Sequence, residues 1–147
     1  MIAAILQETG LAADKLELEI TESLPLVDNE FNQTILGRLK KLGIRLALDD
    51  FGLNSSLGLL RQFPVDTLKI DRSFVQEMIE KAESASLVVA LISMAHAFQL
   101  KVVAEGVETA EQLTYLLIQR CDEGQGYLFS PPVPASEFSD LLRRETR

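Results

Sequence analysis

Charged and amide side chains stand at or just after the ends of short hydrophobic runs along this chain. The residues at these positions are Glu19, Glu22, Asp49, Asp50, Lys69, Asp71, Glu105, Glu108 and Gln125. If the runs are parallel strands, their carboxyl ends meet on one rim, where catalytic side chains of such folds gather. Carboxylates that share a rim repel one another and raise one another's pKa values, and divalent cations would relieve that repulsion. The pattern therefore predicts a metal site.

The ligand types indicate which metal and which reaction. Oxygen ligands without histidine or thiolate suit Mg²⁺ or Mn²⁺, and a pair of such ions can clamp the attacking and leaving oxygens at phosphorus. The adjacent Asp49 and Asp50 could serve two metals, because successive side chains of a strand point in different directions. Lys69 could stabilise charge on a phosphate or hold a metal-bound water, and Glu105 could act as a base. On pattern alone, these acids are equally well explained as surface acids or strand-end caps.

The elements that would position these residues alternate along the chain. Strands are predicted at 16–20, 44–50, 67–71, 101–105 and, more weakly, 124–128, and helices at 29–42, 55–63, 84–99, 109–119 and 136–144. Asp71 is predicted to cap a helix from Ser73 onward, and Thr109 with Gln112 resembles a capping box. This alternation predicts an α/β fold built from about five parallel βα units with right-handed crossovers.

Composition excludes several classes of protein. With 147 residues, of which 47% are hydrophobic and 24% charged, the chain is expected to form one globular domain. A net charge of −8 without a lysine or arginine cluster argues against a nucleic acid polymer as partner. Cys121 is the only cysteine, which favours a reducing compartment. The longest apolar stretch, 87–98, is shorter than the ~20 residues of a membrane span, so we expect no membrane segment and a cytoplasmic location.

Five motifs resemble a known family in their order and spacing. They are Leu-Glu-Leu-Glu-Ile-Thr-Glu-Ser (16–23), Asp-Asp-Phe-Gly (49–52), Pro-Val-Asp-Thr-Leu-Lys-Ile-Asp (64–71), Val-Val-Ala-Glu-Gly-Val-Glu-Thr (102–109) and Gln-Gly-Tyr-Leu-Phe-Ser-Pro-Pro (125–132). Together they look like the later motifs of the EAL-domain cyclic di-GMP phosphodiesterases. The resemblance implies a TIM-like (β/α) barrel and a reaction that hydrolyses cyclic di-GMP to linear pGpG with Mg²⁺ or Mn²⁺.

The resemblance also implies catalytic and metal-binding roles. Glu19 and Asp49 would be metal ligands, and Asp50 would serve the second metal. Lys69 would bind the metal-associated water, and Glu105 would be the general base or would position that water.

Three further residues would have substrate-binding or supporting roles by the same resemblance. Gln125 would line the site near the second metal and the substrate, Glu22 would anchor the loop that follows the Asp-Asp pair, and Glu108 would support the site. By contrast, Tyr127 and Phe129 are predicted to be core residues, with stacking on a guanine base as the alternative.

The resemblance further implies that residues 1–147 are part of an EAL-type domain. Residues 1–10 look like the end of the helix before the family's fourth strand, so the five strands would correspond to the fourth through eighth, without the Glu-Ala-Leu segment. The 53–57 loop lacks the family's usual Gly-Tyr. We therefore expect weak or no hydrolysis by this chain alone; the alternative is a non-catalytic module that binds cyclic di-GMP or another protein. Unpaired strand edges would favour self-association or pairing with another chain, or an open sheet.

Overall fold

The computed structural model describes residues 1–21, 30–52, 60–61 and 63–145. Its helices are α1 (Ile2–Thr9), α2 (Glu30–Lys41), α4 (Arg72–Glu77), α5 (Ala82–Ala97), α6 (Ala110–Ile118) and α7 (Ala135–Glu145), with a 3₁₀ turn at Ala13–Lys15. Its strands are β1 (Glu17–Thr21), β2 (Arg45–Phe51), β3 (Thr67–Ile70), β4 (Lys101–Glu105) and β5 (Glu123–Gln125). Most of the helix predicted at 55–63 lies outside the described residues.

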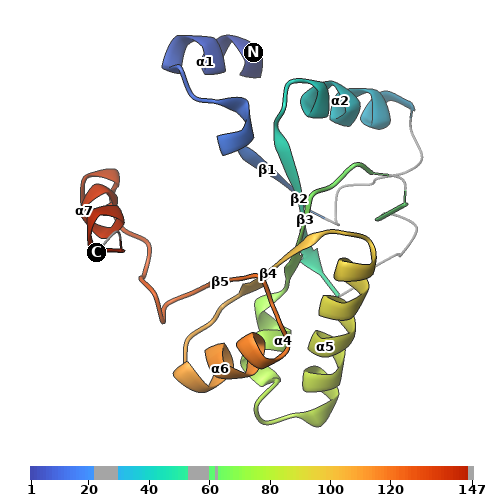
Figure 1. Cartoon of the computed structure of the whole chain (residues 1–147), viewed down its shortest axis with the longest axis vertical. Helices are drawn as coiled ribbons and strands as arrows, with labels where there is room; N and C mark the ends of the chain where they lie inside the picture. The colour runs from blue at the N-terminus through green and yellow to red at the C-terminus, as the bar shows by residue number, and fades with distance from the viewer. Residues whose placement is uncertain (22–29, 53–59, 62, 146–147) are drawn as a thin grey trace.

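The five strands form one parallel sheet in chain order, β1-β2-β3-β4-β5 (Figure 1). Helix α2 connects β1 to β2, α4 and α5 connect β3 to β4, and α6 connects β4 to β5, as parallel βα units require. Part of the connection between β2 and β3 lies outside the described residues. The predicted α/β class and its five parallel units are confirmed. Among the described residues β1 pairs only with β2 and β5 only with β4, so the sheet is open.

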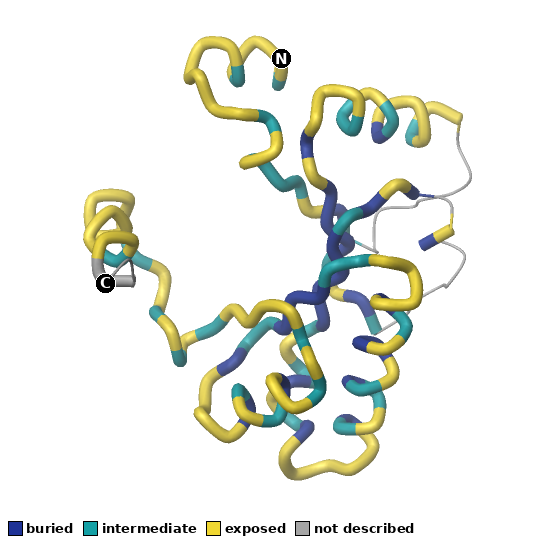
Figure 2. The backbone as a smooth tube through the Cα atoms, viewed as in Figure 1, coloured by how far each residue is buried: buried dark blue, intermediate teal, exposed yellow. Residues whose placement is uncertain are grey.

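The core lies over the central strands. All four residues of β3 are buried, and β2 and β4 each have three consecutive buried residues. Helix α5 covers this sheet with Val88, Leu91, Ile92 and Ala95. Figure 2 shows the same distribution: buried residues gather at the sheet and on the inner side of α5, whereas α1 and α7 are mostly exposed.

Local sequence signals explain where two helices begin. Oδ1 of Asp71 accepts a hydrogen bond from the Ser73 N–H at 2.8 Å, which caps α4 as predicted. At α6, Oγ1 of Thr109 accepts from the Gln112 N–H, and Oε1 of Gln112 accepts from the Thr109 N–H. This reciprocal pair is the predicted capping box.

Strand β5 is shorter than predicted because the chain turns after Gln125. The N–H of Val107 donates to the Gln125 carbonyl, and the N–H of Leu128 donates to the Val107 carbonyl, both at 3.0 Å. These bonds fold residues 126–128 over the segment after β4 instead of extending the ladder. Separately, no helix in the described ranges is long and apolar enough to cross a membrane.

Candidate metal and catalytic site

A single lysine joins the acids at the carboxyl end of the sheet. Lys69 lies on β3, and its side chain is 6% exposed. Its Nζ is 2.6 Å from Oε1 of Glu19, 3.1 Å from Oδ1 of Asp49 and 2.6 Å from Oε1 of Glu105. These carboxylates come from β1, β2 and β4, so the parallel order of the strands brings them around the central one. The sequence-based prediction that these four residues share one rim agrees with this geometry.

Burial and these close contacts shift the pKa values of Lys69 and Glu105. Burial alone would lower the pKa of Lys69, but its close contacts with the carboxylates of Glu105, Glu19 and Asp49 raise that pKa above its usual range. Lys69 is therefore a permanent cation at neutral pH. Burial raises the pKa of Glu105, and the ammonium of Lys69 opposes that rise. Glu105 is consequently a more basic carboxylate than one in water, which suits a proton acceptor.

Three carboxylates converge beside this lysine. One oxygen from each of Asp49, Asp50 and Glu105 lies within 4.8 Å of the others. Asp50 has a left-handed φ of 55°, at an irregularity in the β2–β3 register between Leu48 and Phe51. This local backbone turn brings its carboxylate toward that of Asp49. Asp50 lies within β2, but its left-handed φ departs from regular strand geometry, so strand alternation alone does not set the direction of its side chain.

One carboxylate oxygen in this group accepts no hydrogen bond within the described part of the chain. Oδ1 of Asp49 is buried, and the Lys69 ammonium lies 3.1 Å away as an ionic neighbour. A buried polar atom of this kind normally has a partner. Because two more carboxylate oxygens lie close by, the donor set fits a hard divalent cation such as Mg²⁺ or Mn²⁺.

Asp71, predicted from the sequence as a strand-end residue and a helix cap, is also a neighbour of the site. The pKa of Asp50 is raised by its partial burial, then by the charges of Asp49 and Asp71 and by a hydrogen bond with Asp71. Asp71 therefore lies against the acid group in addition to capping α4. The spacing contained a signal for this, since Lys69 and Asp71 are two residues apart and share one face of an extended segment.

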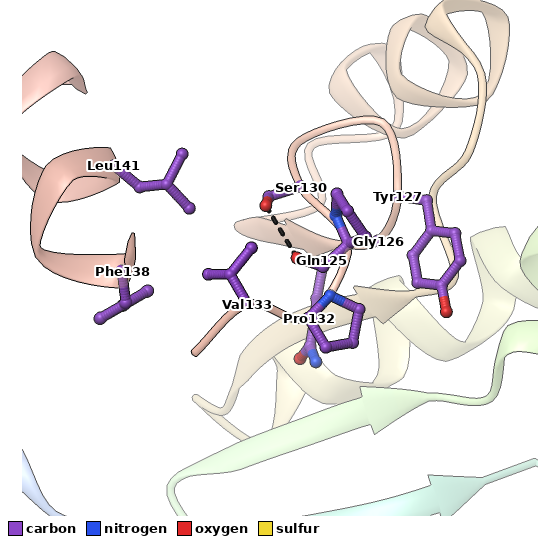
Figure 3. Close-up of a pocket in the computed structure, with 9 residues that line it drawn as sticks. Gln125, Gly126, Tyr127, Ser130, Pro132, Val133, Phe138 and Leu141 are labelled. Atoms are coloured by element: carbon purple, nitrogen blue, oxygen red, sulfur yellow. Dashed lines mark hydrogen bonds between the residues drawn. The ribbon is translucent and has the colours of Figure 1, made fainter. Parts of the chain in front are cut away.

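Gln125 also lies at this rim. It pairs with Glu105 in the β4–β5 register and is exposed. A pocket of about 410 Å³ begins at Gln125 and is lined by Tyr127, Pro132 and Phe138 among others, as Figure 3 shows. Tyr127 is 67% exposed and Phe129 49%, so the prediction that both are core residues was wrong. Their segment leaves the sheet at the turn after Gln125, which removes them from the interior.

The structure does not bring the remaining predicted residues into the group. Glu108 is exposed, and its Oε1 accepts a hydrogen bond from Nε2 of Gln76 at 3.0 Å; within the described ranges it has no contact with the three acids. Glu22 lies outside the described residues, so its predicted role stays a prediction.

One known protein family matches most of this chain. A model of the EAL domain matches residues 1–132. The chain belongs to the EAL-domain family. Among curated proteins, the cyclic di-GMP phosphodiesterase NbdA of Pseudomonas aeruginosa is 45% identical over 139 residues, which cover 94% of this chain and 18% of NbdA. The chain thus spans about a fifth of the length of the curated relatives it matches.

Solved EAL structures have the same fold. The EAL domain of Mycobacterium smegmatis DcpA is 45% identical with a TM-score of 0.92, and the match covers 97% of this chain and 65% of that one. The manganese and cyclic di-GMP complex of Klebsiella pneumoniae BlrP1 is 32% identical with a TM-score of 0.83, covering 89% of this chain and 34% of that one. The EAL neighbours are TIM-barrel-like, which confirms the predicted family and the predicted relation to that barrel.

Proposed function

We propose that the carboxyl end of this sheet is the divalent-metal site of a phosphodiesterase that hydrolyses cyclic di-GMP to linear pGpG. The observation that carries the proposal is the convergence of Asp49, Asp50 and Glu105 within 4.8 Å, next to the buried ammonium of Lys69. Two relatives support the choice of substrate: NbdA is named a cyclic di-GMP phosphodiesterase, and BlrP1 was solved with manganese and cyclic di-GMP.

Asp49 and Asp50 would hold the metal, which we take to be Mg²⁺ or Mn²⁺, with Glu19 as a further ligand by the family resemblance. Oxygens of Asp49, Asp50 and Glu105 converge, whereas Oε1 of Glu19 lies 2.6 Å from the Lys69 ammonium. When bound, such ions lower the pKa of water and neutralise charge on a phosphodiester. The ammonium of Lys69 lies among these carboxylates on the same rim, and its positive charge would stabilise the phosphate or hold the attacking water.

Hydrolysis of cyclic di-GMP forms one bond from a water oxygen to phosphorus and breaks one bond from phosphorus to a ribose oxygen. Glu105 would take the proton of the attacking water, since burial raises its pKa above the usual range of a carboxyl group. Gln125 would line the substrate side of the rim next to Glu105. Glu108 and Glu22 would act in support, Glu108 by holding the start of α6 through its contact with Gln76 on α4.

We also propose that residues 1–147 are part of an EAL domain and that full activity needs the intact domain. The supporting observations are the open five-stranded sheet and the 65% coverage of the DcpA EAL domain. On this proposal the chain alone hydrolyses cyclic di-GMP weakly or not at all. The substrate and the lone cysteine fit a cytoplasmic location.

Calorimetric titration with Mn²⁺ tests the metal site directly. We expect binding by the 147-residue chain, weakened at least about tenfold by Asp49→Asn and by Glu105→Gln. Glu83→Gln is the matched control, because Glu83 is an exposed acid in the first turn of α5, and it should bind Mn²⁺ like the parent chain. Equal affinity in all four proteins would refute the assignment.

Chromatography of cyclic di-GMP after incubation with the chain and Mn²⁺ tests the reaction. Formation of pGpG that Glu105→Gln abolishes would establish hydrolysis by the chain itself. Retention of cyclic di-GMP without product would instead indicate the non-catalytic binding module. If the chain neither binds nor converts cyclic di-GMP, alone or within an intact domain, the proposed substrate is wrong.

A further inference from the structure

Strands β3 and β5 are each preceded by an aspartate that binds the strand before it in the chain. Oδ2 of Asp66 accepts a hydrogen bond from the N–H of Leu46 on β2 at 2.8 Å. Oδ2 of Asp122 accepts one from the N–H of Val102 on β4, also at 2.8 Å. Leu46 and Val102 are the second residues of their strands. Both contacts therefore lie at the amino end of the sheet, opposite the acid group.

A basic side chain from the helix that leads into the bound strand completes each contact. Nζ of Lys40, on α2, lies 2.5 Å from Oδ1 of Asp66. Nε2 of His96, on α5, lies 3.0 Å from Oδ2 of Asp122. The lysine, donor and aspartate of the first contact each stand 56 positions before the histidine, donor and aspartate of the second. In Figure 1 α2 leads into β2 and α5 into β4, so the two contacts occupy equivalent places in the fold.

The turns between these helices and strands repeat with the same spacing. The N–H of Gly43 donates to the Lys40 carbonyl, and the N–H of Gln99 donates to the His96 carbonyl, both at 2.9 Å. Gly43 and Gln99 have left-handed φ values of 87° and 60°. A left-handed φ is uncommon outside glycine, so its recurrence at Gln99 indicates a repeated helix–strand unit rather than two unrelated contacts.

Asp66 holds both backbone polar groups of Leu46. Its N–H donates to the Leu46 carbonyl at 2.8 Å, and its carboxylate accepts from the Leu46 N–H. The pairing of β3 with β2 begins one residue later, at Thr67 and Ala47. A shift of β3 by one residue would lose both bonds and would exchange the two faces of the strand. Asp66 thus opposes the shift that would turn Lys69 away from its acids.

Strand β5 depends on its aspartate for a different reason. It has three residues, all of them exposed, so packing contributes little to its register. Asp122 comes directly before it, and its last residue, Gln125, pairs with Glu105. Gln125 follows Asp122 by three positions, as Lys69 follows Asp66. Each aspartate at the amino end therefore stands one short strand away from a side chain of the rim.

We propose that Asp66 and Asp122 are positioning residues, which set the register of β3 and β5 through their bonds to β2 and β4 and thereby place Lys69 and Gln125 at the rim. The inference deepens the proposed function and rests on it for the use that the site makes of these two side chains. The register itself is measured without metal or substrate. A chain that fails to bind Mn²⁺ therefore contradicts the proposed function and not this inference.

Nuclear magnetic resonance of the Lys69 ammonium tests the register of β3. Three carboxylate oxygens lie 2.6 to 3.1 Å from its Nζ, so its protons should exchange slowly with water and give a resolved ¹H–¹⁵N signal, assigned by its absence from Lys69→Met. Asp66→Leu removes the acceptor for the Leu46 N–H, and we expect the signal to shift or disappear while circular dichroism shows the parent fold. Asp66→Asn is the matched control, because its amide oxygen still accepts that hydrogen bond, and it should keep the signal. An unchanged signal in Asp66→Leu, or equal loss in both variants, overturns the proposal.

Hydrogen exchange tests β5 independently and decides the proposal if Asp66→Leu does not fold. The N–H of Val107 donates to the Gln125 carbonyl at 3.0 Å, so its exchange rate reports the position of β5. We expect Asp122→Leu to speed exchange at Val107 at least about tenfold more than at the buried Ile92 of α5, and Asp122→Asn to leave that ratio as in the parent chain. Equal acceleration at Val107 and Ile92 would mean that Asp122 only stabilises the fold, and would overturn the proposal.

Discussion

Helices α5 and α7 carry similar apolar side chains at similar spacing but differ completely in burial. On α5, Val88, Leu91 and Ile92 are buried against the sheet. On α7, Phe138 and Leu142 are more than half exposed. An amphipathic sequence determines that a helix has a face to bury, whereas the strands beneath it decide whether that face is covered. Stability should therefore concentrate at the central strands and α5.

The same contrast holds for charged pairs. Lys69 contacts its acids with a side chain that is 6% exposed, whereas Lys101 pairs with Glu123 at the sheet edge with a side chain that is 37% exposed. Water screens the second pair and not the first. Replacing Lys69 should therefore lower the free energy of unfolding much more than the same replacement of Lys101.

The largest effect is expected from Lys69→Met. Removing the ammonium leaves the carboxylates of Glu19, Asp49 and Glu105 close together without a counter-charge, which should lower the free energy of unfolding by about 3–5 kcal/mol at neutral pH. Lys101→Met is the control, with an expected loss below about 1 kcal/mol. Urea denaturation of both variants measures the difference.

The pH dependence of Lys69→Met sharpens that prediction. The pKa of Glu105 is already raised by burial, and loss of the ammonium would raise it further. A carboxyl group with a raised folded-state pKa binds its proton more tightly in the folded chain, so stability increases as the pH falls toward the unfolded value of about 4.3. The deficit of the variant should therefore narrow between pH 7 and that value. A constant deficit would show that packing, not charge, is lost.

The next largest effect is expected from Ile92→Ala on α5. Ile92 is 2% exposed within the core, and truncating such a side chain leaves a cavity that costs about 2–5 kcal/mol. Urea denaturation measures the loss. A cost below about 1 kcal/mol would mean that α5 is not firmly packed on the sheet, contrary to the comparison with α7.

Local patterns predicted much of this fold, for reasons visible at particular residues. Strand alternation identified β2, β3 and β4 to within a residue, and the caps at Asp71 and Thr109 were predicted because their hydrogen bonds are local. The position of Lys69 among three acids depends on β3 being central in the sheet, which is a tertiary property. The left-handed turn at Asp50 likewise arises from the β2–β3 irregularity and has no local signal in the sequence.

The junction between the central strands and the exposed α7 segment can be tested with Gly126→Ala. A Cβ at Gly126 would overlap the backbone of Val107, whose carbonyl receives the Leu128 N–H. We expect a loss of about 1–3 kcal/mol in unfolding free energy. Gly37→Ala in α2 is the control, since nothing lies within 4 Å of the added Cβ, and it should leave stability unchanged or raise it. Equal stability of both variants would argue against this packing.

A smaller effect is expected at the end of the sheet opposite the acids. Oδ2 of Asp122 accepts hydrogen bonds from the Val102 N–H at 2.8 Å and pairs with His96 at 3.0 Å. Burial alone would raise the pKa of Asp122, but these two contacts lower it. Asp122→Asn should cost about 1 kcal/mol at neutral pH, because the exposed site is screened.

Stability measurements at acidic pH separate the effect of the Asp122 charge from that of its hydrogen-bond geometry. A carboxyl group with a lowered pKa stabilises the fold above its unfolded value of about 3.9, and that stability is lost as the pH falls through the lowered folded-state value. The parent chain and Asp122→Asn should therefore converge in stability once the pH has fallen below the lowered folded-state pKa of Asp122. A gap that persists there would assign the effect to hydrogen-bond geometry alone.

The smallest effect is expected from Leu142→Ala on α7. Leu142 is 54% exposed, so truncation removes little buried surface and leaves no enclosed cavity, and the loss should stay within about 0.5 kcal/mol. Urea denaturation of Leu142→Ala and Ile92→Ala compares what the two helices contribute to the free energy of unfolding. If Leu142→Ala costs as much as Ile92→Ala, the apolar face of α7 is packed as firmly as that of α5, contrary to the contrast in exposure between the two helices.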